Sequence, residues 1–383
     1  MAVTIASAGD IMLGRGVAEE VQRPRSHLLF SGRLREAAAQ ADLFVVNLEC
    51  CISERGGPAP VPGKSFFYRA PPAAVDVLVD LGVDVVSLAD NHALDFGAGA
   101  LADARRLLAG AGIETVGAGA NAEEARTALV MKAGELSVGI VAVTDRPADF
   151  AAGPGRPGMA HGDLRRGLPD WLADRVHTVR RHTDITLVSV RWGPNIVSAP
   201  VSHVRRAAAD LAGAGAPLVA GHSAHVFHGF IRHVSYALGD FTGDYATHPA
   251  LLNDLELLWL VTLDEDGPWR TEAVPITLDH CHTRLADQAG YDWTADRLTT
   301  VCAALGTRVA PRGDRLVANW PRRPAHVTSA SRSASARAHR SPRKNSASVV
   351  PAPSGPAWHD HPGARRRFRG DVAPSGALRE ETI

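Results

Sequence analysis

Hydrophobic runs rich in β-branched residues recur along the chain and predict the strands of a sheet. The eight predicted strands are Val3–Ala8, Leu43–Val46, Val83–Ala89, Leu136–Val143, Ile185–Val190, Leu218–Ala220, Val234–Leu238 and Leu257–Leu263. Between several of them lie Ala-, Leu- and Arg-rich segments with helical spacing, at 32–41, 71–82, 97–112 and 201–215. Strands that alternate with helices predict an α/β domain.

After residue 245 the pattern changes but still predicts regular structure. Two hydrophobic stretches flank the sequence DEDGPW at 264–269, which predicts an antiparallel hairpin. The segment 294–306 has the spacing of a terminal helix. We therefore expect residues 1–320 to form one domain.

The last 63 residues differ from the rest in composition and charge. Residues 321–383 are rich in Ser, Ala, Arg and Pro and carry about +8, whereas residues 1–320 carry about −8, so the net charge of zero hides a division. Such a segment buries too little apolar surface to offset its ordering entropy, which predicts a disordered basic tail. Because the body is acidic, we do not expect nucleic acid to be its main partner.

No run of about 18 apolar residues is present, so we expect no membrane span. Met1 leads directly into the first predicted strand, without the charged and apolar regions of a signal peptide. These features predict a cytoplasmic location.

Polar side chains of the kinds that bind metals follow six of the hydrophobic runs. They are Asp10, Asn47 with Glu49, Asn91 with His92, Arg191, His222 with His225, and Asp240. Sites in open α/β sheets form at the carboxyl ends of strands, and most of these endings have a glycine nearby. Each residue alone has an ordinary structural explanation, such as a helix cap for Asp10, but the repeated pattern favours a shared site.

The chemistry of these side chains is that of a divalent cation site. Carboxylates of Asp10 and Glu49, the amide oxygen of Asn91 and the imidazoles of His222 and His225 form a mixed oxygen and nitrogen set. Such sets suit Mn, Zn or Fe. One ion or two adjacent ions would bind an anionic substrate and activate water.

At this point the chain resembles a known family. The blocks GDIMLGR, NLECCIS, KSFFYRAPP, VVSLADNHALDFG, IETVGAGAN, RWGPNIVSAP, AGHSAHVFHG and YALGDF are similar, in order, to those of bacterial capsule-synthesis proteins of the CapA (poly-gamma-glutamate) type. The match covers roughly residues 3 to 245. That family resembles the calcineurin-like metallophosphoesterases, which implies an α/β fold with a two-sheet β-sandwich flanked by helices. The hairpin after residue 255 would complete the second sheet.

The resemblance also implies roles for individual residues. The metal ligands would be Asp10, Glu49, Asn91, His222 and His225. His92 would act as a general acid or transition-state donor, oriented by Asp95. Arg15 and Lys64 would bind an anionic substrate.

This chain departs from the family pattern at several positions, and two of them bear directly on the metal site. Arg191 stands in RWG where the family has HWG, and GDF with Asp240 replaces GNF. A guanidinium stays protonated and cannot bind a metal, so Arg191 either weakens one metal site or takes a catalytic part by binding the substrate's anion directly. Asp240 would add a carboxylate ligand.

Two functions follow from these features. One is a metal-dependent hydrolase acting on an anionic phosphoester or poly-acidic substrate. The other is a non-catalytic binding or assembly factor for an anionic polymer such as poly-gamma-glutamate. The sequence leaves the substrate, the metal and the oligomeric state open.

Overall fold

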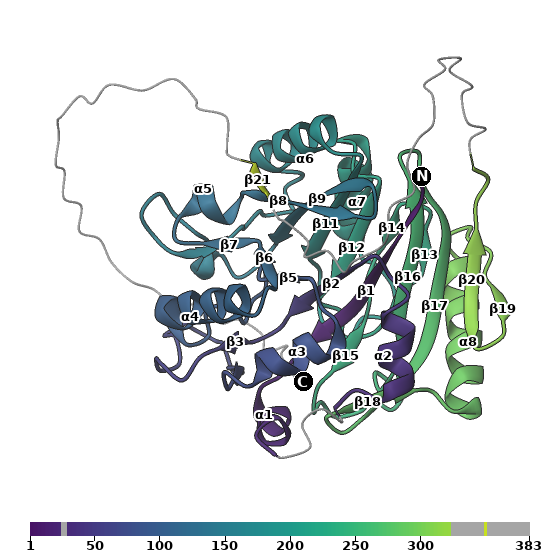
Figure 1. Ribbon diagram of the computed structural model, residues 1–383, viewed down its shortest axis with the longest axis horizontal. Helices are drawn as coiled ribbons and strands as arrows, with labels where there is room; N and C mark the ends of the chain where they lie inside the picture. Colours follow the sequence, from purple (N-terminus) through teal and green to yellow (C-terminus); the bar gives the residue numbers. More distant parts are fainter. Residues whose placement is uncertain (24–28, 323–347, 351–383) are drawn as a thin grey trace, which may run out of the picture. The chain divides into compact units, whose positions relative to one another are not determined.

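Two β-sheets packed face to face, with helices on their outer sides, organise the chain in the computed structural model (Figure 1). The structure describes residues 1–23, 29–322 and 348–350, which belong to the unit Met1–Pro351. The predicted two-sheet α/β fold is therefore confirmed. Most of the predicted tail, 321–383, lies outside the described residues.

The larger sheet has ten strands and contains the N-terminus. Its order is β19-β20-β17-β16-β1-β2-β5-β6, with β15 paired to β1 and β18 to β17. The bounds are β1 Val3–Ile11, β2 Leu43–Leu48, β5 Val85–Ser87, β6 Glu114–Val116, β15 Asp240–Thr242, β16 Leu255–Asp264, β17 Gly267–Asp279, β18 His282–Leu285, β19 Ala310–Arg312 and β20 Arg315–Asn319.

The smaller sheet has seven strands in the order β13-β14-β12-β11-β9-β8-β21. The bounds are β8 Ala128–Ala133, β9 Leu136–Thr144, β11 Ile185–Arg191, β12 Leu218–His222, β13 Phe230–Ile231, β14 Val234–Ser235 and β21 Ser348–Val350. The last of these lies in the predicted tail and pairs antiparallel with β8. Two short pairs stand apart, β3 Cys51–Ile52 with β4 Arg69–Ala70, and β7 Ala118–Gly119 with β10 Gly158–Met159.

The helices connect the strands and cover the sheets. They are α1 Arg15–Val21, α2 Gly32–Ala38, α3 Ala74–Leu81, α4 Gly97–Gly110, α5 Ala122–Ala125, α6 Asp170–His182, α7 Ser202–Gly213 and α8 Gln288–Ala303, with a short 3₁₀ helix at Ala148–Phe150. Among the helices in the described part of the chain, none has the length and apolar character that crossing a bilayer requires.

Alternation of side chains along the strands explains the layers. In β1, Val3 and Ile5 join the core between the sheets, whereas Ala6 and Ala8 pack in the core beneath the helices. In β9, Ile140 lies between the sheets and Val141 packs against α6 and α7. Successive residues of a strand point to opposite faces, so strands that are apolar on both faces are buried between two other layers.

The predicted strands match observed ones with two corrections. The run Val234–Leu238 forms only the two residues of β14, because the chain then turns through Gly239 (φ +83°) into β15. The hairpin β16–β17 is present, but β16 pairs with β1. It therefore extends the ten-stranded sheet rather than the second sheet.

Strand direction brings the polar endings together. Strands β1, β2 and β5 are parallel neighbours, and β9, β11 and β12 are parallel neighbours in the other sheet. In register, Asp10 lies beside both Asn47 and Asp240, and Arg191 lies beside His222. The parallel arrangement therefore collects side chains from distant segments at one edge.

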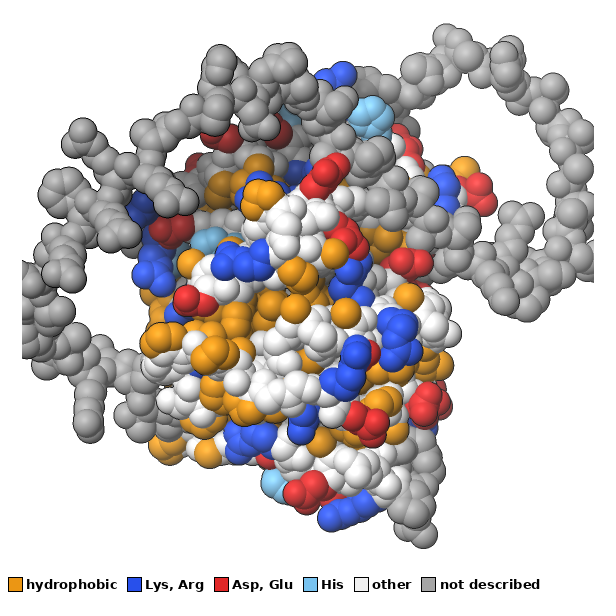
Figure 2. Space-filling view, turned by 90° about the vertical axis from the view of Figure 1, so that its left-hand side faces the viewer, with side chains coloured by type: hydrophobic (Ala, Val, Ile, Leu, Met, Phe, Trp, Pro, Cys, Tyr) orange, Lys and Arg blue, Asp and Glu red, His pale blue; other side chains and the backbone are white. Residues whose placement is uncertain are grey.

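Side chains of both charges are interspersed with hydrophobic ones on the face shown in Figure 2. Among the described residues visible there, Lys and Arg do not gather into a single patch.

Candidate metal centre

Asp10 and Asn47 form the floor of the site. Asn47 donates its amide hydrogens to Oδ1 of Asp10 and to Oδ2 of Asp90, both at 2.9 Å, and all three residues are fully buried. Gly9 allows β1 to approach β15 closely, because a Cβ at this residue would lie 2.2 Å from the carbonyl oxygen of Gly239. The close approach of β1 and β15 thus fixes Asp10 next to Asp240.

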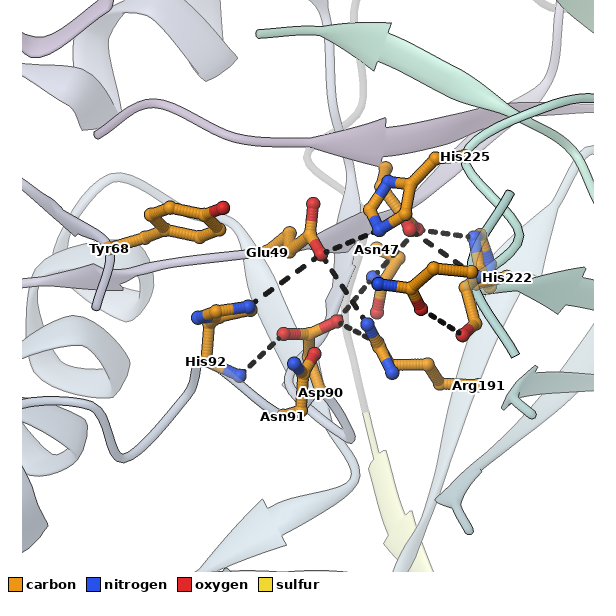
Figure 3. A network of polar contacts seen from close by, with 12 residues as sticks. Asn47, Glu49, Tyr68, Asp90, Asn91, His92, Arg191, His222 and His225 are labelled. Carbon is orange, nitrogen blue, oxygen red and sulfur yellow. Dashed lines mark hydrogen bonds and ion pairs between the residues drawn. The ribbon is translucent and has the colours of Figure 1, made fainter. Parts of the chain in front are cut away.

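Glu49 occupies the middle of the site, directly after β2. Its Oε1 lies 3.5 Å from Nη2 of Arg191, 3.5 Å from Nε2 of His225 and 3.9 Å from Nε2 of His92. Its Oε2 accepts a hydrogen bond of 2.7 Å from Tyr245. Nitrogen atoms of Arg191, His225 and His92 therefore surround Oε1 of Glu49 at distances longer than those of ordinary hydrogen bonds (Figure 3).

Arg191 ends β11 and is held between two carboxylates. Its Nε lies 2.9 Å from Oδ2 of Asp90, and its side chain is only 2% exposed. Burial disfavours the charged form, but Asp90 and Glu49 raise the pKa of Arg191 above its usual value. A permanent positive charge thus occupies the site beside Glu49.

His222 and His225 reach the site from the end of β12 by a strained loop. Ser223 (φ +102°) and His225 (φ +53°) have left-handed backbones that non-glycine residues seldom adopt. Nδ1 of His222 lies 3.1 Å from Oδ1 of Asp10, and Nδ1 of His225 lies 2.8 Å from Oδ1 of Asp240. A carboxylate bound to one imidazole nitrogen leaves the other to face the site, as is common at metal centres.

His92 lies on the opposite side of Glu49 from His222 (Figure 3). Its Nδ1 contacts Oδ2 of Asp95 at 2.6 Å, and its ring stacks on Tyr68 with centroids 4.1 Å apart. Lys64 lies 3.1 Å from Oδ1 of Asp95 and donates to the backbone oxygen of Asn91 at 3.0 Å. These partners fix the imidazole, and when Asp95 is ionised its contact favours the tautomer with the hydrogen on Nδ1.

The pKa values of the carboxylates follow from burial and from their neighbours. Burial raises the pKa of Glu49 to about 8, with Asp10 and Asp90 acting in the same direction against His225 and Arg191. For Asp10 burial is outweighed by the hydrogen bond and charge of His222, and its pKa falls to about 2. Burial also raises the pKa of Asp240.

The histidines shift in opposite directions. Burial opposes protonation of His225, but Glu49 and Asp240 raise its pKa to about 10. Burial and the charge of Lys64 lower the pKa of His92 well below its usual value. His92 is therefore neutral, and its Nε2 faces Glu49 at 3.9 Å.

These residues suit a divalent cation. Ligand atoms of Asp10, Glu49, His225 and Asp240 all lie within 4.8 Å of one another. In the described part of the chain, Oδ2 of Asp240 and Oδ1 of Asn91 are buried without a hydrogen-bond partner. Four carboxylates, those of these three acids and Asp90, also outnumber the one permanent cation Arg191, so a bound cation would offset the excess negative charge.

The structure brings most of the predicted site residues together. Asp10, Glu49, His222, His225, His92, Asp95 and Arg191 are buried around one centre, with Asn91 beside them. Arg15 lies at the rim with a side chain 43% exposed, whereas the ammonium of Lys64 is held by Asp95. Substrate binding by these two residues stays a prediction.

Three further residues belong to the site but were not predicted as site residues. Asp90 holds Arg191, Tyr245 holds Glu49, and Tyr68 packs on His92. Asp90 had a signal, since it directly precedes Asn91 at the end of a hydrophobic run. The two tyrosines come from loops, and no feature of the sequence places them here.

Comparison with known proteins gives a family match. The family model described as bacterial capsule synthesis protein PGA_cap matches residues 4–245. A probable polyglutamine synthesis accessory protein of Mycobacterium tuberculosis is 29% identical over 365 residues, covering 82% of this chain and 95% of that protein. The PGA biosynthesis protein CapA of Bacillus subtilis is 25% identical, covering 70% of each chain.

Two other similarities have lower coverage or a weaker structural fit. The capsule biosynthesis protein CapA of Bacillus anthracis is 26% identical and covers 63% of this chain and 60% of its own length. A crystal structure of a hypothetical protein from Thermus thermophilus aligns with a TM-score of 0.38 and 15% identity, covering 73% of this chain and 96% of that one.

Proposed function

This chain belongs to the bacterial capsule synthesis protein family PGA_cap, and from that premise we propose that it is a metal-dependent hydrolase of an anionic phosphoester or poly-acidic substrate. Its biological context would be the synthesis of a capsule or of an acidic polymer, as in the relatives named for those roles. One observation carries the proposal: three buried carboxylates and an imidazole from separate segments lie within 4.8 Å of one another.

Asp10, Glu49, His225 and Asp240 would hold one divalent ion. Such an ion supplies positive charge for an anionic substrate and makes a water molecule more acidic. Tyr245 holds Glu49 by its hydrogen bond, and Asp240 orients His225. The ligands are therefore positioned before any ion arrives.

Arg191 would supply the second positive charge of the site. Its guanidinium is buried, paired with Asp90 and Glu49, and permanently charged. The positive charge of Arg191 would repel a second divalent ion nearby. Position 191 also lacks the imidazole that could bind such an ion. We therefore expect one ion per chain, with Arg191 contacting the anionic group of the substrate.

His92 would take a proton at Nε2 rather than give one. The contact with Asp95 keeps the hydrogen on Nδ1, and burial with Lys64 keeps the ring neutral. A positioned neutral imidazole can accept a proton from an attacking water and return it to the leaving group. This differs from the general acid expected from the resemblance, because the resting ring lacks the proton to donate.

Elemental analysis and an assay of the full chain test this function. We expect one equivalent of Mn, Zn or Fe per chain, and hydrolysis of bis-p-nitrophenyl phosphate when Mn²⁺ is added. His225→Ala should lose both, whereas His182→Ala, an exposed histidine on α6, should lose neither. Absence of bound metal, or activity unchanged in His225→Ala, would refute the proposal.

A second function is favoured by the ion pairs of Arg191. Arg191 would offset part of the negative charge of Glu49 and Asp90 without an ion, and the half-exposed Arg15 at the rim would attract an anionic polymer. This is the non-catalytic binding or assembly role. Calorimetric binding of poly-gamma-glutamate in a chelator, together with absence of hydrolysis in Mn²⁺, would support it over the hydrolase.

A further inference from the structure

A buried carboxyl group lies next to the backbone of the metal centre without a hydrogen-bond partner. Glu256, near the start of β16, is 0% exposed. Among the described residues, neither of its side-chain oxygens has a partner with hydrogen-bond geometry. Burying a carboxyl without such a partner costs folding free energy, so its presence requires an explanation. None of the steps proposed for the metal centre uses Glu256.

Glu256 lies against the backbone segment that carries Asp240. A Cβ at Gly239 would be 1.8 Å from Oε2 of Glu256, so the carboxyl occupies the space that a side chain at this position would need. The pairing of β16 with β1 ends at Leu258, and β15 then pairs with β1 through Asp240 and Asp10. Glu256 therefore lies where β16 separates from β1 and β15 enters the sheet.

The same carboxyl is close to the segment that carries His225. Burial raises the pKa of Glu256 well above its usual value, and the backbone N–H groups of Phe227 and Asp240 act in the opposite direction. Neither N–H contact has hydrogen-bond geometry, so the groups interact through their dipoles and charge. Phe227 follows His225 by two residues. Glu256 is therefore next to both backbone segments that carry the candidate ligands His225 and Asp240.

Arg297 of α8 contacts the first of these segments through Phe227. Its Nη2 donates to the backbone oxygen of Phe227 at 3.4 Å, and its guanidinium carbon lies 5.0 Å from the centroid of the Phe227 ring. Burial lowers the pKa of Arg297, and the charge of Glu256 opposes that shift. Both residues come after residue 245, where the family match ends.

We infer that Glu256 and Arg297 are positioning residues that hold the backbone of His225 and Asp240 so that both side chains reach one ion. The left-handed backbone of His225 (φ +53°) is a conformation that surrounding contacts must maintain. Side chains that touch the ligands rather than the ion commonly set the affinity of a metal centre. The inference rests on the proposed function, because it concerns the ligands of that site.

Calorimetric titration of the full metal-free chain with Mn²⁺ tests this role. We expect Glu256→Leu to weaken Mn²⁺ binding about tenfold, because the two ligand segments lose the group between them. Glu256→Gln keeps the shape and a polar oxygen, so its affinity should stay within about threefold of the parent. Thr186→Val is the matched control, because the hydroxyl of Thr186 on β11 is also fully buried and lacks a partner among the described residues. The control should bind Mn²⁺ as the parent does.

The stability of the metal-free protein separates positioning from a general structural role. Leucine replaces a buried carboxyl that has no partner, so the melting temperature of Glu256→Leu should rise or stay within about 3 °C of the parent. A residue needed only for folding would lower the melting temperature and the Mn²⁺ affinity together. That result, with glutamine giving no rescue, would overturn the inference.

Arg297→Met tests the same segment by a variant that leaves Glu256 in place. We expect Mn²⁺ binding to weaken about threefold, because only the segment of one ligand is released. Combined with Glu256→Leu, the loss should be smaller than the product of the two single losses, since both residues act on Phe227. Arg232→Met is the matched control, since Arg232 also donates to a backbone carbonyl, that of Pro268.

Hydrolysis of bis-p-nitrophenyl phosphate by the same proteins distinguishes this inference from the proposed function. If the parent hydrolyses the ester, and Glu256→Leu and Arg297→Met bind Mn²⁺ as tightly as the parent, the hydrolase stands and the positioning role is wrong. If Mn²⁺ affinity depends on both residues but no protein hydrolyses the ester, the positioning role stands and the hydrolase is wrong. A parent chain that binds no Mn²⁺ would contradict both.

Discussion

The two sides of the site balance their charges in different ways. On the His92 side, Asp95 is paired with Lys64 at 3.1 Å, contacts His92, and accepts the backbone N–H of Tyr68 at 2.6 Å. On the other side, Glu49 has only long contacts to His225 and Arg191, and Oδ2 of Asp240 has no hydrogen-bond partner among the described residues. On the first side a cation pairs with the buried carboxylate at 3.1 Å, whereas on the other side the nitrogens of Arg191 and His225 come no closer than 3.5 Å to Glu49.

This difference separates positioning from binding. Buried polar groups that satisfy one another hold a side chain in place, whereas an excess of buried negative charge is stable only if a cation arrives or protons are taken up. Glu49 shows proton uptake of this kind, since its pKa is raised to about 8. We therefore expect perturbations of the two sides to differ in sign as well as in size.

Removing the cation of the balanced side should have the largest effect. Lys64→Met leaves Asp95 buried without its partner, and we expect a loss of roughly 3 kcal/mol in unfolding free energy at pH 8. Burial already raises the pKa of Asp95 to about 7, so the carboxyl is neutral at pH 5 and the loss there should be smaller. Urea unfolding at both pH values measures this.

Lys132→Met, at an exposed position on β8, is the matched control and should change little at either pH. An equal loss at pH 5 and pH 8 for Lys64→Met would mean that packing rather than charge dominates, and the comparison of the two sides would fail.

The unbalanced side should make the metal-free protein less stable as pH rises. Folded Glu49 keeps its proton up to about pH 8, whereas the unfolded chain releases it near 4.5. Unfolding then releases a proton between these values, so stability falls with rising pH. His225, with a pKa raised to about 10, acts in the same direction above 6.5.

We expect the melting temperature in a chelator to fall by about 5 °C between pH 5 and pH 8, equivalent to roughly 2 kcal/mol. Mn²⁺ should remove most of the fall, because the ion binds the ionised carboxylate. A melting temperature that rises with pH in the chelator would contradict the charge imbalance.

Replacing the central carboxylate should stabilise the empty site. Glu49→Gln removes a buried negative charge, and we expect a gain of about 1 kcal/mol for the metal-free protein at pH 8. The same variant should lose the stabilisation by Mn²⁺, because a main ligand is gone. Differential scanning fluorimetry with and without Mn²⁺ reports both changes, and a variant still stabilised by Mn²⁺ to the parent's extent would exclude Glu49 as a ligand.

The sequence reveals which residues meet at the site better than how those residues pair. Asp10, Glu49 and Asp240 each follow a hydrophobic run, so their convergence at one sheet edge was predictable from strand direction. The pairing of Asp90 with Arg191 could not be predicted in this way, because it depends on how the two sheets face each other. The approach of His225 was equally hidden, since Ser223 and His225 adopt left-handed backbones without a glycine to indicate the turn.

The fold shows the same division between local and long-range information. Periodicity located the strands, but the partner of the hairpin β16–β17 is set by tertiary packing, and β16 joined β1 rather than the second sheet. The irregular register between Ser7 and Asp10, which places Asp10 beside Asn47, likewise has no signature in the sequence beyond Gly9.

The smallest expected effect concerns the hydroxyl that holds Glu49. Tyr245→Phe removes a hydrogen bond of 2.7 Å to Oε2, and we expect a loss of about 1 kcal/mol in unfolding free energy. Tyr236→Phe, on the outer face of the seven-stranded sheet, is the matched control and should cost less. Because the hydroxyl positions a carboxylate that an ion also holds, the loss should shrink when Mn²⁺ is bound. A loss that is the same with and without Mn²⁺ would mean that Tyr245 acts together with the paired groups around His92 and does not position a metal ligand.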